Sequence, residues 1–324
     1  MAHDDQIAHF SRLVRDGMRQ GMTRRAFLRR GLAMGLSLPV ILGIVERRDL
    51  VAATATPTAT PVPTVRFAMI GDFGMAGEPA AAVAAMVKGW EPDFIVTTGD
   101  NNYPAGSSKT LDANVGQYYS AYLSPYQGKY GTGGEAKRFF PVLGNHDWDQ
   151  GLPRFYLRYF DLPGNGRYYT IDRDPVMFFF LDSALDEPDG VRRTSKQALW
   201  LQEALAAAPA DRWKLVVFHH PPYSSGHHGS ARWMRWPFRE WGADAVITGH
   251  DHNYERLTID GLPYMVNGLG GGSRYAPGSV RIEESHVFFN KDHGAMRVAA
   301  ETRSISFEFV TRAGKSIDTF ALTR

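Results

Sequence analysis

Acidic, amide and imidazole side chains recur directly after short apolar runs of this sequence. Five places carry them, and their residues are Asp72, Asp100, Asn145-His146-Asp147, His219-His220 and His250-Asp251-His252. A single aspartate after a strand is ordinary turn chemistry, but turns alone do not explain five such places. Nitrogen and oxygen donors without sulfur suit iron, zinc or manganese, and a carboxylate can bridge two ions. The pattern therefore predicts a hydrolytic site built on two metal ions.

The apolar runs that precede these side chains predict strands, and the segments between several of them predict helices. The expected strands are 65–70, 93–98, 138–143, 175–181, 213–218 and 243–247, and the expected helices are 79–88 and 195–208. Strands that alternate with helices predict an α/β fold, and continuous apolar runs predict burial on both faces. Ligands of such sheets bind outside the carboxyl ends of the strands, where the candidate side chains are expected to meet.

After residue 254 the pattern changes to alternating strands at 295–300, 304–310 and 316–321. We expect these later strands to form a second, more antiparallel sheet. The predicted architecture is a four-layer α-β-β-α sandwich of two mixed sheets flanked by helices. Its binuclear metal site is expected at the C-terminal ends of the strands.

Five short blocks of the sequence carry a family resemblance. In chain order they are GDFG (71–74), GDNNY (99–103), GNHD (144–147), VVFH (216–219) and GHDH (249–252). They resemble the blocks of the purple acid phosphatases, a branch of the calcineurin-like metallophosphoesterase superfamily. Tyr103 sharpens the resemblance, because metallophosphoesterases outside this branch usually lack that tyrosine. The chain resembles the small, tartrate-resistant-acid-phosphatase-like type, although the pair His227-His228 resembles the large type.

The resemblance implies a binuclear centre of Fe(III) and a divalent ion, which is iron, zinc or manganese. The implied ligands are Asp72, Asp100, Tyr103 and His252 for Fe(III), and Asn145, His219 and His250, with bridging Asp100, for the divalent ion. Hard Fe(III) prefers anionic oxygen, whereas a softer divalent ion accepts imidazole and an amide oxygen. The implied reaction is attack of a metal-bound hydroxide on phosphorus.

Histidines close to these ligands have other implied roles. His146 resembles the family's non-ligand histidine, which contacts the phosphoryl group and helps to protonate the leaving alcohol. A second such histidine is expected on the loop after His219, where His228 matches the family's spacing best. The adjacent His227 can share or take that role as a substrate-binding residue. His220 is expected to support the site or to pack beside it.

The expected function is an exported acid phosphatase whose partner is a small-molecule phosphate monoester. A phosphodiesterase or nucleotide hydrolase on the same fold is the first alternative, and a non-catalytic, metal-stabilised surface protein is the second. Residues 51–324 hold 27 basic and 29 acidic residues, so this part of the chain is almost neutral. A protein that binds nucleic acid generally needs a dominant basic surface, and we expect no nucleic-acid partner.

Residues 1–50 contain nine arginines and five acidic residues, so the basic charge is concentrated at the N-terminus. Arg24-Arg25, followed by Phe27-Leu28 and an uncharged run over 31–45, resembles a twin-arginine export signal. We expect an export signal over 1–55, a Pro/Thr linker over 56–64 and a metallophosphoesterase domain over 65–324. The expected partner is the twin-arginine export machinery, and the expected location is periplasmic or extracellular, including the cell surface. Membrane contact is expected only through an uncleaved signal.

The 324-residue chain has no cysteine, which excludes disulfides, a thiolate nucleophile and cysteine-based metal sites. Two further segments are interpreted as structural. Residues 267–273 (NGLGGGS) fail the spacing of a dinucleotide-binding loop and predict a turn close to the site. Residues 232–241 predict a helix packed on a sheet, because their arginines and tryptophans fall on opposite helical faces.

Overall fold

The structure is a computed structural model that describes residues 9–10, 24–37, 39–42, 64–148 and 152–324. Contacts divide the chain into two units, 1–62 and 63–324. In the first unit helix α2 spans Arg24–Ala33, and Phe10, Leu36 and Ile41 form a small buried cluster. Among the described residues, no helix is long and apolar enough to cross a membrane. The expected cleavage region and residues 56–63 of the expected linker lie outside the described residues, so the expected boundaries stay a prediction.

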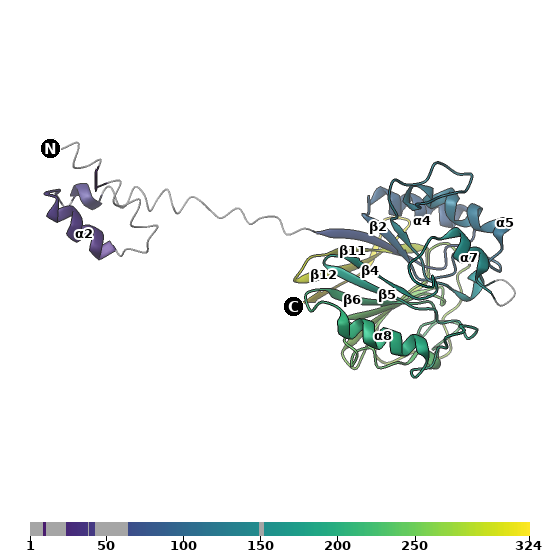
Figure 1. Ribbon diagram of the computed structural model, residues 1–324. Helices are drawn as coiled ribbons and strands as arrows, with labels where there is room; N and C mark the ends of the chain where they lie inside the picture. The colour runs from purple at the N-terminus through teal and green to yellow at the C-terminus, as the bar shows by residue number, and fades with distance from the viewer. Residues whose placement is uncertain (1–8, 11–23, 38, 43–63, 149–151) are drawn as a thin grey trace. The chain divides into compact units, whose positions relative to one another are not determined.

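The second unit contains two mixed β-sheets (Figure 1). The first sheet has the order β13-β12-β11-β1-β2-β3, with β1 Val65–Ile70, β2 Phe94–Thr97, β3 Phe139–Phe140, β11 Gly294–Ala300, β12 Ser304–Thr311 and β13 Ser316–Thr323. The second sheet has the order β10-β8-β9-β7-β6-β5-β4, with β4 Tyr169–Arg173, β5 Val176–Phe180, β6 Trp213–Val217, β7 Ala245–Thr248, β8 Tyr254–Ile259, β9 Leu262–Asn267 and β10 Ser285–Phe289. The strands that lead to the candidate site, β1, β2 and β3 in one sheet and β6 and β7 in the other, pair in parallel within their sheets.

Helices cover the outer faces of the two sheets. The longest are α4 (Glu78–Gly89) and α8 (Lys196–Ala207), which lie on opposite sides of the two sheets in Figure 1. The Ser195 side chain caps α8 by accepting a hydrogen bond from the Ala198 N–H. The shorter elements are α5 (Ser108–Leu111), the π-helix η1 (Asp112–Gly116), α6 (Gln117–Tyr119), α7 (Arg154–Tyr159) and the 3-10 turns η2 (Ser120–Tyr122), η3 (Asn145–Asp147) and η4 (Arg232–Met234).

Alternation along the buried strands explains the layers. On β5, Phe178 and Phe180 point into the core between the two sheets, whereas Phe179 points into the core beneath α8. On β1, Met69 faces the core between the sheets and Ile70 faces the core beneath α4. Because successive side chains of a strand point to opposite faces, an uninterrupted apolar run serves two cores at once. The predicted four-layer sandwich of two mixed sheets is confirmed.

Two details of the predicted fold are wrong. The strands after residue 254 do not form a sheet of their own, because β8, β9 and β10 extend the second sheet while β11, β12 and β13 extend the first. Strand β11 pairs antiparallel with β1, which places late and early segments side by side. Residues 232–241 form only the short turn η4, although Trp236 and Phe238 are buried as expected of a packed segment. Pro237 lacks an N–H and disfavours a continuous helix here.

Candidate metal centre

The backbone at the ends of the strands holds the candidate ligands in place. Asp72 follows β1, Asp100 lies shortly after β2, and His250 lies shortly after β7, with φ angles of 56°, 52° and 69°. Left-handed backbone is unfavourable for residues with a side chain, by roughly 1–2 kcal/mol each. The Asp72 N–H donates to the Gly99 carbonyl at 3.0 Å, and the His250 N–H donates to the Asp72 carboxylate at 3.0 Å. These bonds hold the strained positions, as is common at functional sites.

Two glycines allow the strand ends to approach one another. Gly99 has a φ of 97°, and a Cβ on it would lie 2.6 Å from Nδ1 of His219. A Cβ on Gly144 would lie 2.2 Å from Oδ1 of Asp100. Real Cβ atoms do not tolerate such separations. Glycine before Asp100 and before Asn145 is therefore required for the close packing of the donor atoms.

The first group of donor atoms contains two carboxylates, a phenol and an imidazole. The hydroxyl of Tyr103 donates to Oδ2 of Asp100 at 2.8 Å and lies 3.1 Å from Nε2 of His252. Nε2 of His252 lies 3.4 Å from Oδ1 of Asp72. All four side chains are buried. The four residues expected to hold Fe(III) therefore meet at one point, although their role as ligands stays a prediction.

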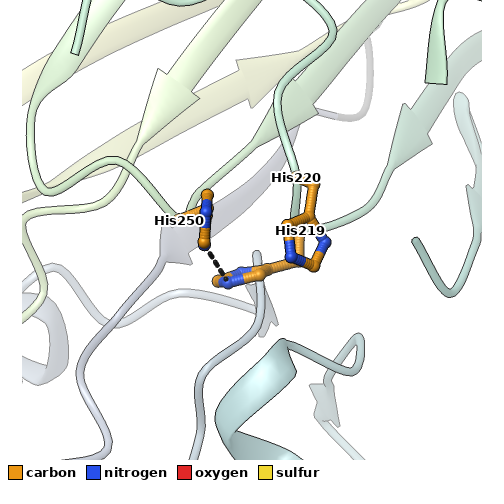
Figure 2. A group of neighbouring side chains, drawn as sticks. All are labelled: His219, His220 and His250. Carbon is orange, nitrogen blue, oxygen red and sulfur yellow. Dashed lines mark hydrogen bonds between the residues drawn. The ribbon is translucent and has the colours of Figure 1, made fainter. Parts of the chain in front are cut away.

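The second group of donor atoms lies on the other side of Asp100. Nε2 of His219 lies 3.4 Å from Oδ1 of Asp100 and 3.1 Å from Oδ1 of Asn145. Figure 2 shows the rings of His219 and His250 next to each other, with 3.2 Å between Nε2 of His219 and Nδ1 of His250. The expected ligands of the divalent ion therefore also converge. Asp100 presents one oxygen to each group, which is the geometry expected of a bridging carboxylate.

Main-chain carbonyls fix the orientation of two imidazoles. Nδ1 of His219 lies 2.8 Å from the Thr98 carbonyl, and Nδ1 of His252 bonds the Ser273 carbonyl. A carbonyl oxygen only accepts hydrogen bonds, so Nδ1 must carry a proton, and Nε2 is the nitrogen that points toward the other donor atoms of the site. Histidines that bind metals are usually oriented in this way. Neither Thr98 nor Ser273 could be identified from the sequence, because a main-chain acceptor has no sequence signal.

The carboxylates and the other donor atoms of the site favour a bound positive charge. Burial alone would lower the pKa of His219, but the Asp100 carboxylate and its neighbour Asp72 raise it to about 10. Burial would raise the pKa of Asp100, but His219 holds it well below its usual range. Two imidazole nitrogens, an amide oxygen and a carboxylate oxygen face one another, which is unfavourable unless a cation or a proton lies between them. The donor set therefore fits a pair of metal ions that share Asp100.

His220 lies beside the second group. Its ring nitrogen is within 4.8 Å of those of His219 and His250, so proximity alone would allow it to bind a metal. However, the Ser183 hydroxyl lies 2.9 Å from Nδ1 of His220 and accepts a hydrogen bond from the His220 N–H at 2.9 Å. Burial lowers the pKa of His220 to about 3, which keeps it neutral. This environment agrees with a supporting role for His220.

His146, His227 and His228, the histidines expected to contact substrate, lie at the rim of the site. The ring of His146 is 4.5 Å from that of Tyr103, and its Nδ1 bonds the Pro104 carbonyl at 2.6 Å. The ring of the exposed His228 lies 4.5 Å from that of His250, whereas the ring of His227 lies 5.2 Å from those of Tyr275 and His228. His228 is therefore nearer to the second group of donor atoms. The roles of these histidines stay predictions.

No role was assigned from the sequence to two residues that shape this rim. The buried Asp251 accepts hydrogen bonds from the His228 N–H at 2.7 Å and from the Ser224 hydroxyl, so it fixes the loop that carries His227 and His228, here called the histidine loop. Tyr275 stacks on His252, with 4.4 Å between ring centroids and 23° between planes. Asp251 lies between two expected ligands, and that position is a usable signal. Tyr275 follows the glycine-rich segment 267–273, whose Gly272 N–H donates to the Asp72 carbonyl at 2.7 Å.

Two stacked mixed sheets with a two-part donor site at the strand ends define a metallophosphatase fold. The model of the calcineurin-like phosphoesterase family matches residues 65–254, and the chain belongs to this family.

Curated relatives include acid phosphatases. The chain is 29% identical to purple acid phosphatase 17 of Arabidopsis thaliana over 252 residues, which cover 67% of this chain and 71% of the relative. It is 27% identical to mouse (Mus musculus) tartrate-resistant acid phosphatase type 5 over 321 residues, which cover 83% and 93%. Among solved structures, the purple acid phosphatase PPD1 of yellow lupin matches with a TM-score of 0.67 and 17% identity, covering 82% of this chain and 54% of that one. That last likeness concerns the fold.

Proposed function

We propose that this chain is an exported binuclear-metal acid phosphatase that hydrolyses phosphate monoesters. The observation that carries the proposal is Asp100, whose two carboxylate oxygens face two separate groups of donor atoms. The similarity of the chain to purple and tartrate-resistant acid phosphatases supports this function. Fe(III) would occupy the group that contains Tyr103, and divalent iron, zinc or manganese would occupy the group that contains His219. When bound, the two cations would neutralise phosphate oxygens and lower the pKa of the attacking water.

The rim histidines would handle the substrate. Because the Pro104 carbonyl engages Nδ1 of His146, its Nε2 is left to face other partners, and no described residue bonds Nε2. A protonated His146 would donate from Nε2 to a phosphoryl oxygen or transfer that proton to the leaving alkoxide as the P–O bond breaks. His228 would contact the phosphoryl group from the side of His250, with its backbone held by Asp251. His227 would contact the more distant part of the substrate.

The test combines metal analysis, a visible spectrum and two substrates. We expect two metal ions per chain, a tyrosinate–iron absorption band, and faster hydrolysis of an aryl phosphate monoester than of the matching diester. Tyr103→Phe should abolish the band, whereas Tyr264→Phe, a change of the same size on strand β9, should keep it. Faster hydrolysis of the diester would favour the phosphodiesterase. Two bound metals without any hydrolysis would favour the non-catalytic protein, and absence of bound metal would refute both enzyme functions.

Export through the twin-arginine machinery belongs to the same proposal. Its support is the pair Arg24-Arg25 followed by the uncharged run over residues 31–45. Replacing both arginines by lysine should trap folded protein in the cytoplasm, and N-terminal sequencing of exported protein should start near residue 55. Undiminished export of the double variant would refute this route. Phosphatase activity in cell extracts measures the function of the enzyme whether or not it is exported.

A further inference from the structure

A cavity of about 560 Å³ opens next to the histidine loop. Its lining includes Tyr223, His227, His228, Arg232, Arg235 and Glu284. Binding pockets for small molecules commonly have volumes of about 300–1,000 Å³. The cavity is therefore large enough for a sugar or a nucleoside, and none of the expected metal ligands lines it.

The cavity adjoins the candidate metal centre through one residue. His228 lines the cavity, and its ring lies 4.5 Å from that of His250, an expected metal ligand. The loop that carries His228 is fixed by the buried Asp251. A phosphate ester with its phosphoryl group at the metal centre would therefore extend its leaving group past His228 into this cavity.

Two arginines give the cavity positive charge. The guanidinium of Arg235 lies 4.4 Å from the centre of the Tyr223 ring, and its Nε donates to the Pro222 carbonyl at 3.0 Å. Stacking and this bond orient the guanidinium, and no described residue bonds its two terminal nitrogens, which suits recognition of a planar or tetrahedral anion. Arg232 is exposed, and its side chain forms no ion pair or hydrogen bond with any described residue.

Among the cavity-lining residues of the described chain, the only acidic side chain is Glu284, and no ion pair joins it to either arginine. The cavity thus has more guanidinium groups than carboxylates. A solvated basic surface would explain exposed arginines, but it would not explain why the guanidinium of Arg235, although exposed, is held on the Tyr223 ring at the wall of this cavity. An unpaired cationic group in a concave site favours an anionic ligand.

We propose that this cavity is a subsite for a second phosphate, so that the chain prefers substrates whose leaving group carries another phosphoryl group. The inference rests on the proposed phosphatase function and specifies its substrate class. Water attacks the phosphorus held at the metal centre, the bond between this phosphorus and the oxygen of the leaving group breaks, and that oxygen receives a proton. The second phosphate stays intact and is held by Arg232 and Arg235.

The kinetic test compares glucose 1,6-bisphosphate with glucose 6-phosphate. In Arg232→Gln, Arg235→Gln and the double variant, we expect KM for the bisphosphate to rise by about tenfold per lost guanidinium, with KM for the monophosphate unchanged. Arg239→Gln is the matched control, because Arg239 is an exposed arginine of the same segment, 232–241, but does not line the cavity. Equal changes on both substrates, or no change on either, would overturn the subsite.

A binding measurement separates failure of the subsite from failure of the proposed function. Calorimetry of the two sugar phosphates with metal-loaded His146→Ala protein reads affinity when turnover is slow or absent. Tighter binding of the bisphosphate, lost in the double arginine variant, supports the subsite even if no substrate is hydrolysed. Equal affinities of the two ligands would overturn it, even if the chain proves to be an active phosphatase.

Discussion

Replacing Gly99 by alanine should damage the metal centre and the fold together. The added Cβ would lie 2.6 Å from Nδ1 of His219 and 3.0 Å from the backbone nitrogen of Gly144. The φ of 97° adds strain of about 1–2 kcal/mol, and overpacking in a rigid interior adds about 1–3 kcal/mol. We therefore expect the free energy of unfolding to fall by about 2–5 kcal/mol.

The same substitution should also weaken metal binding. To relieve the overlap, the His219 ring must move away from the Thr98 carbonyl that fixes its orientation at 2.8 Å. Loss of such a supporting bond typically lowers metal affinity by about 10- to 100-fold. Metal content after dialysis at a fixed free-metal concentration measures this loss, and thermal unfolding measures the change in stability.

Gly314→Ala provides the matched control. Gly314 has a φ of 78°, but a Cβ on it would meet no atom within 4 Å. Backbone strain alone should lower the free energy of unfolding of this variant by about 1–2 kcal/mol, and its metal content should not change. If Gly99→Ala retains its metal and is destabilised no more than Gly314→Ala, the close approach between Gly99 and His219 does not matter and the reasoning is refuted.

Three further results are expected. Chelation should lower Tm reversibly, because each cation held at 100-fold above its Kd adds about 2.7 kcal/mol to the free energy of unfolding. An unchanged Tm in a chelated protein shown to be metal-free would argue against cations at this site. Phe178→Ala should cost about 3–5 kcal/mol in urea unfolding, since Phe178 is fully buried, whereas Leu185→Ala, at a side chain 70% exposed, should change stability by less than about 0.5 kcal/mol. Asp251→Ala should lower kcat by about 10- to 100-fold through displacement of His228. Metal content should be retained, and Asp251→Asn should largely restore activity. A normal kcat in the alanine variant would show that the hydrogen bonds of Asp251 are dispensable.

The sequence was most informative where one local pattern has one structural outcome. The apolar runs at β1, β5 and β6 predicted strands buried on both faces, and these strands have that environment. The candidate ligands could be predicted to converge because parallel strands bring their carboxyl ends to one edge. Their roles as ligands remain to be tested by metal analysis.

Other features depend on contacts between distant segments and could not be predicted from the sequence. Alternation at β11 indicates a strand but does not say that its partner is β1, some 230 residues earlier in the chain. The periodicity of residues 232–241 fits a helix, yet burial of Trp236 and Phe238 is achieved by turns instead. The orientation of His252 depends on the main-chain carbonyl of Ser273, and every residue type offers the same carbonyl.

The two sheets contribute different halves of the donor set, and this division has a mechanical consequence. Asp72 and Asp100 follow strands of the first sheet, whereas His219 and His250 follow strands of the second. Any cation bound between Asp100 and His219 therefore cross-links the two sheets at one edge, in a chain that has no cysteine to form a covalent cross-link. Without metal, the sandwich should open first along that edge, and amide hydrogen exchange should be fastest at the ends of β2 and β6.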